Sequence, residues 1–221
     1  MGRWRRFHRR TKTRGLHSLH SMKQPQCLRV ACVLLLCAFF LHSCAKEEPT
    51  QFEFMETYVN GVRCYSLKAC DKDPDVCEIT IPESWNGLPV LRIERNAFQR
   101  VGSTQSIDIG AVEIISNEAF AFCPQLKKVN LRNARIIGGR AFMGCSYMKS
   151  IVIPKTVEEI GRDAFDNCTS LESIYFEGDP NLSGSPIVSS YSTIYGIPGG
   201  NVEAHAQRYG IPFVSWSPTP N

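Results

Sequence analysis

The sequence predicts an α/β repeat solenoid, a right-handed superhelix with a parallel sheet on one face, short helical or 3-10 turns on the other, and a cap at each end. Three observations predict it. Similar blocks of 22 to 28 residues recur between residues 79 and 173, each opens with two apolar residues at a spacing of two, and each later contains an Ala-Phe pair. A spacing of two is typical of a strand, and so short a block cannot cover its own apolar face, so the blocks must stack.

The N-terminal residues 1–43 are predicted to be a basic arm and an export signal, which take no part in the fold. They contain nine Lys and Arg residues and no acidic residue, and Val30–Leu41 is an uncharged stretch of twelve residues. Twelve helical residues rise about 18 Å, too little for a hydrocarbon core of ~30 Å, and this length is typical of a signal peptide. A start at Met22 would give a signal of conventional length. The arm before it is either a start placed too far upstream or a cytoplasmic targeting arm.

The segment Leu41-His42-Ser43-Cys44 resembles a bacterial lipobox, in which the cysteine is lipidated and becomes the mature N-terminus. The resemblance implies that Cys44 carries a lipid and that residues 44–51 are the anchor and a short linker. It also implies export to the outer membrane, either on the periplasmic side or at the cell surface. His42 departs from the small or aliphatic residue that is usual there, so cleavage without lipid attachment is the alternative.

The charge distribution argues against a nucleic-acid partner. The chain has a formal net charge of +4, but nine of its 25 Lys and Arg residues and none of its 21 Asp and Glu residues lie in residues 1–43. Residues 44–221 therefore carry a net charge of −5. A polyanion binds clustered cations that displace its counterions, and this portion has no excess of them.

Residues 52–78 are predicted to form a hairpin cap over the first rung of the solenoid. Asn60-Gly61 lies between two strand-like runs and is typical of a tight hairpin turn. Cys70 and Cys77 enclose an acidic segment, and an exported chain can oxidise its thiols. We expect a disulfide between these two, with Cys64 as the odd thiol. The acidic segment is expected to be a solvated turn, since it lacks the glycine and the distant glutamate of a calcium loop.

Four repeats are predicted between residues 79 and 173. They are Ile79–Ser106, Ile107–Lys128, Val129–Ser150 and Ile151–Ser173. The phenylalanines of their Ala-Phe pairs are expected to form one buried column, which consists of Phe98, Phe120, Phe142 and Phe165. The Ala-Phe-x-x-Cys-x-x-Leu spacing of three would keep one side of a helical or 3-10 turn inward.

A second column of the repeats is occupied by Cys123, Cys145 and Cys168. Successive rungs lie about 4.8 Å apart, a distance that does not exclude a disulfide, but the column favours a small buried side chain in each rung. One cysteine every 22 or 23 residues gives no close pair from which a tetrahedral zinc site could begin. No metal or other cofactor is expected.

Residues 174–221 are predicted to be a degenerate fifth repeat and a C-terminal cap. The strand spacing recurs after residue 173, but the Ala-Phe pair is lost. Asn201 is expected to cap a short helix that runs to Arg208, with Gly210 as its stop. Ile211–Val214 is expected to form a last strand.

Together these columns resemble the BspA-like, treponemal-type leucine-rich repeat family, whose pattern is strand, Pro, Val-x-x-Ile-Gly, x-x-Ala-Phe, x-x-Cys, x-x-Leu. The fourth repeat has this pattern as Ile151-Val-Ile-Pro154, Val157-Glu-Glu-Ile-Gly161, Ala164-Phe165, Cys168 and Leu171. The resemblance covers residues 52–216 and implies a leucine-rich repeat superhelix that binds proteins. Members of the family are associated with attachment to host matrix proteins and with contacts between bacterial cells. The first block departs from the pattern, because it is longer and lacks the cysteine.

The sequence offers no set of residues for catalysis, and we expect no enzymatic activity. Beyond residue 43 the only histidine is His205, which we expect at the surface, so no Ser/His/Asp set can be formed. No Gly-x-Ser-x-Gly motif and no phosphate-binding glycine loop is present in the sequence.

Outward positions of the strand face are the candidate residues for binding a protein partner. They are Lys128, Asn130, Arg132, Val152, Tyr175 and Glu177. A mixture of basic, aromatic and apolar side chains on an open sheet is typical of protein recognition. The sequence therefore predicts an exported, lipid-anchored protein that mediates adhesion to a host matrix or cell-surface protein. The alternative is a periplasmic envelope scaffold with inward-facing partners, and self-association of the open array stays open.

Overall fold

The computed structural model of the protein describes residues 52–70, 77–188 and 191–218. The chain divides into two compact units, Met1–Cys44 and Ala45–Asn221, and all the described residues belong to the second. The predicted export signal, the lipidation site Cys44 and the linker to residue 51 therefore lie outside the described residues. Within the described part of the chain, no helix combines the length and the hydrophobicity that crossing a membrane requires.

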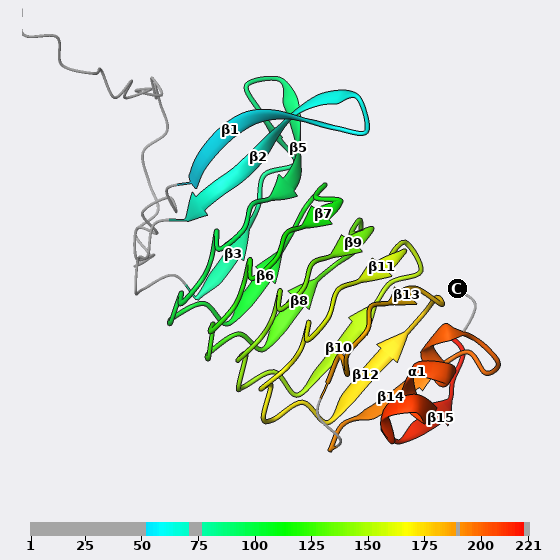
Figure 1. Ribbon diagram of the computed structural model, residues 1–221. Helices are drawn as coiled ribbons and strands as arrows, with labels where there is room; N and C mark the ends of the chain where they lie inside the picture. The colour runs from blue at the N-terminus through cyan, green and yellow to red at the C-terminus, as the bar shows by residue number, and fades with distance from the viewer. Residues whose placement is uncertain (1–51, 71–76, 189–190, 219–221) are drawn as a thin grey trace, which may run out of the picture. The chain divides into compact units, whose positions relative to one another are not determined.

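The described part begins with a hairpin at the predicted position. β1 (Phe52–Val59) and β2 (Val62–Cys70) pair antiparallel across Asn60 and Gly61, whose φ angles of 50° and 80° fit a type I′ turn. β2 then pairs in parallel with β5 (Leu88–Ile93), so the hairpin extends the sheet of the repeats and covers its first edge (Figure 1).

Each coil contributes two strands to the solenoid, one more than the sequence analysis assigned (Figure 1). The first ladder consists of the strands at the start of the repeats, which are β3 (Glu78–Thr80), β6 (Ser106–Asp108), β8 (Lys128–Asn130), β10 (Ser150–Ile153), β12 (Ser173–Phe176) and β14 (Thr193–Gly196). The second ladder consists of β5, β7 (Ile114–Ile115), β9 (Ile136–Ile137), β11 (Glu159–Ile160) and β13 (Asn181–Leu182). All pairs that form within either ladder are parallel. The fold is a parallel β-solenoid of about six turns.

The extra residues of the first block form a second hairpin. β4 (Ser84–Trp85) folds back on β5 across Asn86 and Gly87, which have φ angles of 47° and 79°. This hairpin explains why the first block has 28 residues where the next two have 22.

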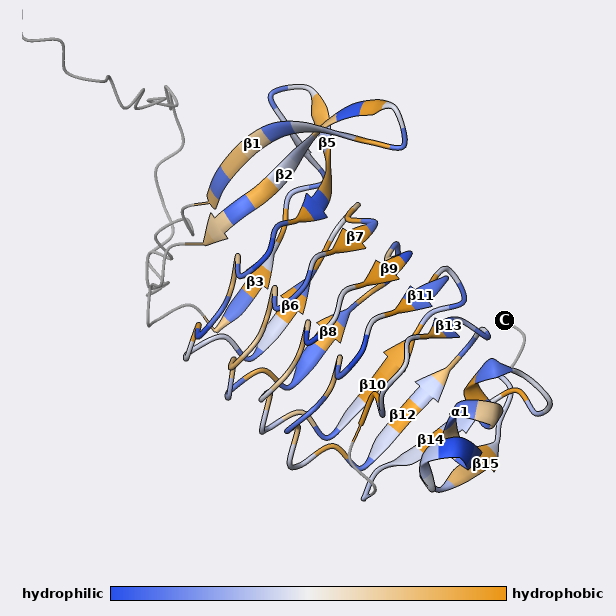
Figure 2. Ribbon diagram, viewed as in Figure 1, coloured by the Kyte–Doolittle hydropathy of each residue, from blue (hydrophilic) through white to orange (hydrophobic). Residues whose placement is uncertain are grey.

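One apolar core runs through the described repeats, and its centre is a stack of phenylalanine rings. The stacked rings are those of Phe98, Phe120, Phe142 and Phe165, with centroids 4.9, 5.2 and 5.4 Å apart and interplanar angles of 19°, 5° and 3°. The three cysteines of the repeat column, Cys123, Cys145 and Cys168, are buried in the same core. Hydrophobic residues alternate with hydrophilic ones along β3, β6 and β8, as strands with one buried side require (Figure 2).

The turns that carry the phenylalanines are not helical, so that part of the predicted fold class is wrong. Two residues in each turn, four positions apart, have positive φ angles; the pairs are Asn96 and Arg100, Glu118 and Phe122, Arg140 and Gly144, and Asp163 and Asn167. Such angles interrupt a right-handed helix.

Hydrogen bonding between the coils accounts for this conformation. The Phe120 N–H donates to the Ala141 carbonyl of the next coil at 2.8 Å, whereas the Ala121 N–H donates to the Glu118 carbonyl of its own turn at 3.1 Å. An α-helix would direct every N–H group back into its own segment. Alternate N–H groups of the turns instead bond to the neighbouring coil, and they hold adjacent coils in register.

The C-terminal cap contains α1 (Asn201–Tyr209), which is the one helix among the described residues. The prediction that Asn201 is its N-cap is wrong, because the helix is preceded by Gly200 and no side chain of the N-cap residue bonds to it. Asp179, 22 residues earlier, accepts hydrogen bonds from the N–H groups of Asn201 at 2.9 Å and Val202 at 3.0 Å. The carboxylate of a neighbouring coil thus caps the helix and ties it to the solenoid.

The end of the helix follows the sequence prediction. Gly210 adopts the left-handed conformation with a φ of 66°, and the chain then enters β15 (Phe213–Ser215). β15 pairs in parallel with β14 and closes the first ladder at the C-terminal side.

The predicted disulfide between Cys70 and Cys77 is not formed in the structure. Cys77 is exposed and its thiol is free, with the sulfur accepting a hydrogen bond from Gln105 Nε2 at 3.7 Å. Cys70 is buried at the end of β2, where its N–H donates to the Ala97 carbonyl at 3.0 Å. Cys70 thus faces the core at the end of β2, whereas Cys77 lies at the surface just before β3 begins. The acidic segment between them lies outside the described residues.

Candidate functional site

The predicted binding residues lie on one surface, the outward side of the first ladder, which we call the strand face. β8 carries Lys128 and Asn130, β10 carries Val152 and β12 carries Tyr175. Arg132 and Glu177 follow the ends of β8 and β12. The structure brings all six together because residues 22 or 23 positions apart occupy equivalent places in successive coils.

At one place on the strand face, a polar cluster fixes two of these side chains. The Arg132 guanidinium donates from Nη2 to both oxygens of Asp108, at 2.9 and 2.8 Å, and Asn130 Nδ2 donates to Asp108 Oδ2 at 3.1 Å. Partial burial acts to raise the pKa of Asp108, but hydrogen bonds from the Gly110 N–H and from Arg132 outweigh it and hold this pKa below its usual value. Arg132 is therefore engaged within the chain, and its charge is largely compensated.

An aromatic group lies toward the C-terminal end of the strand face. The rings of Tyr175 and Tyr195 are stacked with centroids 4.6 Å apart, and Trp216 meets Tyr175 edge-on at 5.4 Å. The sequence predicted Tyr175 as a binding residue but neither Tyr195 nor Trp216. Tyr195 could have been predicted, because it occupies the position in β14 that Tyr175 occupies in β12. Trp216 could not, because it is brought beside Tyr175 only by the pairing of β15 with β14.

A trough runs along the strand face between β8 and β10. It consists of two adjoining hollows of about 610 and 370 Å³, which share Val129, Asn130 and Val152 in their walls. Lys127, Lys128, Tyr147 and Lys149 line the first hollow, and Arg132, Lys155 and Glu177 line the second. Tyr147 and Val152 are exposed to 54% and 48%, so the trough offers apolar surface to a partner.

The first hollow is basic. Lys127, Lys128 and Lys149 are all exposed, and no carboxylate of the described residues lies within 4.0 Å of their ammonium groups. Of the three, only Lys128 was predicted from the sequence. Lys127 and Lys149 precede their strands at equivalent positions 22 residues apart, and this spacing was the available signal.

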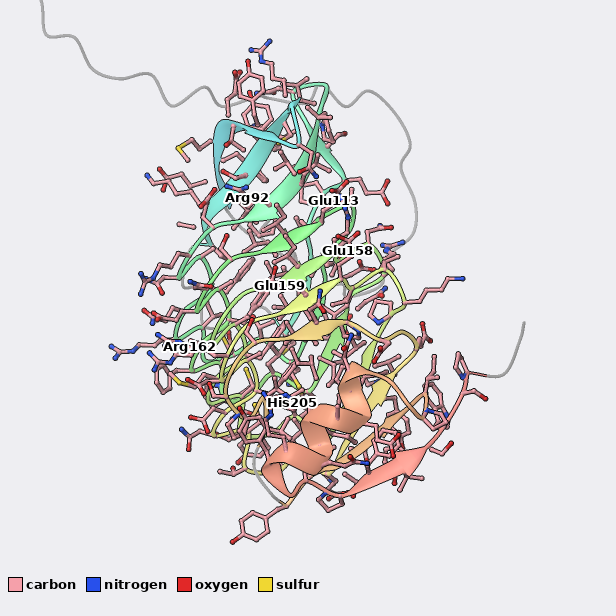
Figure 3. The ribbon with its side chains drawn as sticks, turned by 45° about the vertical axis from the view of Figure 1, so that its right-hand side comes forward. Arg92, Glu113, Glu158, Glu159, Arg162 and His205 are labelled. Carbon is pink, nitrogen blue, oxygen red and sulfur yellow. The ribbon has the colours of Figure 1, made fainter. Side chains whose placement is uncertain are left out.

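A further hollow of about 570 Å³ lies along the edge of the second ladder, and three of its charged side chains are paired with one another. Arg135 bonds to Glu113 at 3.5 Å and to Glu158 at 2.8 Å, which links three successive coils. Figure 3 labels both glutamates beside the strands of this ladder. Because the pairing is internal, this surface has less charge to offer a partner than the trough.

His205 is buried in the structure, so the expectation that it lies at the surface is wrong. It lies in α1 (Figure 3), where its Nε2 accepts a hydrogen bond from the Ile187 N–H at 3.4 Å and its ring contacts Tyr209. Burial lowers the pKa of His205, and the charge of Arg208 acts in the same direction. The histidine therefore packs the cap against the solenoid as a neutral ring. Among the described residues no three His, Cys, Asp or Glu side chains are grouped so as to hold a metal.

Comparison with known proteins agrees with the coil architecture. The family model described as BspA type leucine rich repeat region matches residues 60–187 in six copies. The chain belongs to the BspA-type leucine-rich repeat family. The match includes the hairpin β4–β5, the second ladder and the first ladder as far as β12. Its six copies are two more than the four regular repeats predicted from the sequence, which a degenerate fifth repeat was expected to follow.

Two solved structures share the fold of this BspA-type protein. The leucine-rich repeat protein TpLRR of T. pallidum has 20% identity and a TM-score of 0.55, over 76% of this chain and 80% of that one. The pneumococcal vaccine antigen PcpA has 14% identity and a TM-score of 0.54, over 74% of this chain and 48% of that one. No curated protein sequence matches the chain. Proteins of this family are in general non-enzymatic scaffolds that bind other proteins.

Proposed function

We propose that this BspA-type protein is exported, is held at the outer membrane by a lipid on Cys44, and uses its strand face to bind a host matrix or cell-surface protein in adhesion. The observation that carries the proposal is the strand face itself. It joins a trough, unpaired lysines and an aromatic group on a scaffold whose coils are hydrogen-bonded to one another. Rigid scaffolds with clustered aromatic and basic side chains are suited to protein recognition.

A binding assay on the full chain tests the proposal. The purified protein is passed over immobilised matrix proteins and over cell-surface proteins, and we expect saturable binding to at least one of them. Tyr175→Ala should weaken binding about tenfold, the effect of losing about 1.4 kcal/mol. Tyr58→Ala is the matched control, because Tyr58 is 67% exposed on the hairpin and distant in the fold from the strand face. Equal binding by both variants would argue against the strand face.

A periplasmic envelope scaffold is the second candidate, and the shortness of the linker favours it. Only seven residues, 45–51, separate Cys44 from β1, and fully extended they reach at most about 25 Å. The solenoid would thus stay near the membrane that carries the lipid. Protease treatment of intact cells separates the two candidates, because digestion without lysis requires display at the cell surface. Protection until the outer membrane is opened would support the scaffold.

A further inference from the structure

The first ladder is interrupted at one place, between β8 and β10. β3, β6 and β8 form one set of paired strands, and β10, β12, β14 and β15 form another. On both sides of the interruption the two coils stay joined. The Tyr147 N–H donates to the Pro124 carbonyl at 3.1 Å, and the Glu158 N–H donates to the Arg135 carbonyl at 2.8 Å. The opening is therefore confined to the two strands that form the walls of the trough.

The interruption leaves backbone groups of both strands directed into the trough. On β8, the Lys128 N–H and the Asn130 carbonyl bond to the coil of β6, so the intervening Val129 directs its N–H and carbonyl toward β10. On β10, the carbonyls of the flanking Lys149 and Ile153 accept from the coil of β12, so Ser150 and Val152 face β8. Backbone groups of this kind must bond to water or to a partner.

The side chains at the interruption oppose its closure. Lys127 and Lys149 are equivalent residues of adjacent coils, and full pairing of β8 with β10 would bring two like charges closer. Lys127 Nζ is instead directed to the coil of β6, where it donates a 2.9 Å hydrogen bond to Gln105 Oε1. Val129 is also smaller than Ile107 and Ile151, its counterparts in the coils before and after, and it is only partly buried where they are buried. The trough thus combines free backbone groups, exposed apolar surface and unpaired positive charge.

We propose that the trough binds an extended acidic segment of the partner protein. The segment lies along the strand direction, bonds through its backbone to Val129 and Val152, and places carboxylates beside Lys128 and Lys149. Some Cα atoms of β8 and β10 lie within 8 Å of one another, less than the ~9.6 Å that a strand inserted between them would need, so the segment lies over the trough. The inference rests on the proposed function and names the chemistry of its partner.

The test uses fluorescence anisotropy of the full chain with a labelled octapeptide of alternating Glu and Val. We expect saturable binding, loss of at least tenfold in affinity in the double variant Lys128→Gln/Lys149→Gln, and weaker binding of a peptide with alternate amides N-methylated. The double variant Lys68→Gln/Arg208→Gln has the same net charge and substitutes exposed residues of β2 and α1, so it should bind as the wild type does. Urea unfolding of each variant verifies that the fold is kept.

Four results would overturn the inference, and the fourth separates it from the proposed function. The first is equal peptide affinity in the two double variants, and the second is equal binding of an alternating Lys and Val peptide. The third is sedimentation showing that Lys128→Gln/Lys149→Gln dissociates a dimer, since the occupant would then be a second copy of the chain. Capture of a matrix or cell-surface protein that depends on Tyr175 but survives this double variant would keep the proposed function and reject the trough. Peptide binding as expected, with no matrix or cell-surface protein captured, would keep the trough as a peptide site and reject the proposed function.

Discussion

Phe142 lies at the centre of the ring stack, with Phe120 on one side at 5.2 Å and Phe165 on the other at 5.4 Å. Its side chain is fully buried, so Phe142→Ala would leave a cavity that the neighbouring coils cannot fill without losing their hydrogen bonds. We expect the free energy of unfolding to fall by about 3–5 kcal/mol. Urea denaturation measures this loss. Tyr191→Ala, at a side chain that is 92% exposed, should change it by no more than about 0.5 kcal/mol.

Thiol reactivity tests the cysteine column. The thiols of Cys123, Cys145 and Cys168 donate to the carbonyls of Phe98, Phe120 and Phe142 at 3.0, 3.4 and 3.1 Å. Burial raises the pKa of Cys123 to about 12, and the hydrogen bond with Cys168 together with burial raises the pKa of Cys145. A raised pKa keeps a thiol protonated and unreactive at pH 8. Iodoacetamide at that pH, followed by peptide mass spectrometry, should modify the exposed Cys77 in the native protein and the column only in urea. Modification of the column at the rate of Cys77 would contradict the buried ladder.

At the level of single residues, the sequence predicted the features that recur within each repeat. The phenylalanine and cysteine columns recur in every repeat or nearly so, and each follows from local spacing alone. The bond between Arg132 and Asp108 joins residues 24 positions apart and depends on the register of two coils, which no local pattern encodes. The role proposed for the surface around Lys127 and Lys149 depends on the interruption between β8 and β10, which the sequence does not reveal. His205 was expected at the surface because the N–H group that it accepts from, that of Ile187, comes from another coil.

The turn segments show where periodicity is ambiguous. A spacing of three inward residues fits a helical turn, and it fits equally a series of turns whose alternate N–H groups bond to the next coil. Positive φ angles distinguish the two, and they fall on Glu118, Phe122 and Arg140 as well as on Asn and Gly residues. Since such residues rarely mark the left-handed region, the sequence could not identify the second case. The second ladder was missed for the same reason, because strands of two residues carry too little periodicity.

The N-terminus of α1 gives a test of capping by a distant residue. Asp179→Ala removes the acceptor for two N–H groups of the helix, and we expect the free energy of unfolding to fall by about 0.5–2 kcal/mol. Asn201→Ala, at the residue that local rules favour as the cap, should have a smaller effect, since that side chain makes only a 3.5 Å bond to the Asp179 carbonyl. Thermal unfolding of both variants compares them directly. A larger loss for Asn201→Ala would show that the local rule holds after all.

At the scale of the whole molecule, the part of the solenoid that stabilises the fold is separate from the surface proposed to bind a partner. Stacked rings and bonds between coils stabilise the interior, while the strand face tolerates an opened ladder because the rest of each coil holds the register. Self-association through the trough or the end strands stays a prediction, which the sedimentation arm of the peptide experiment also tests.

The proposed lipid anchor would decide where this surface can act, and Cys44 provides its test. If the cysteine is the modified N-terminus, wild-type cells grown with labelled palmitate should yield a labelled protein in the membrane fraction. Cys44→Ala should carry no label and should leave the membrane, since each buried methylene of an acyl chain contributes about 0.8 kcal/mol to membrane binding. Cys37→Ala, within the apolar run, is the matched control and should behave as the wild type. A wild type without label would leave cleavage alone to explain the signal, and a released solenoid would then find its partner in solution. A labelled Cys44→Ala protein would instead place the lipid on another residue and reject Cys44 as its site.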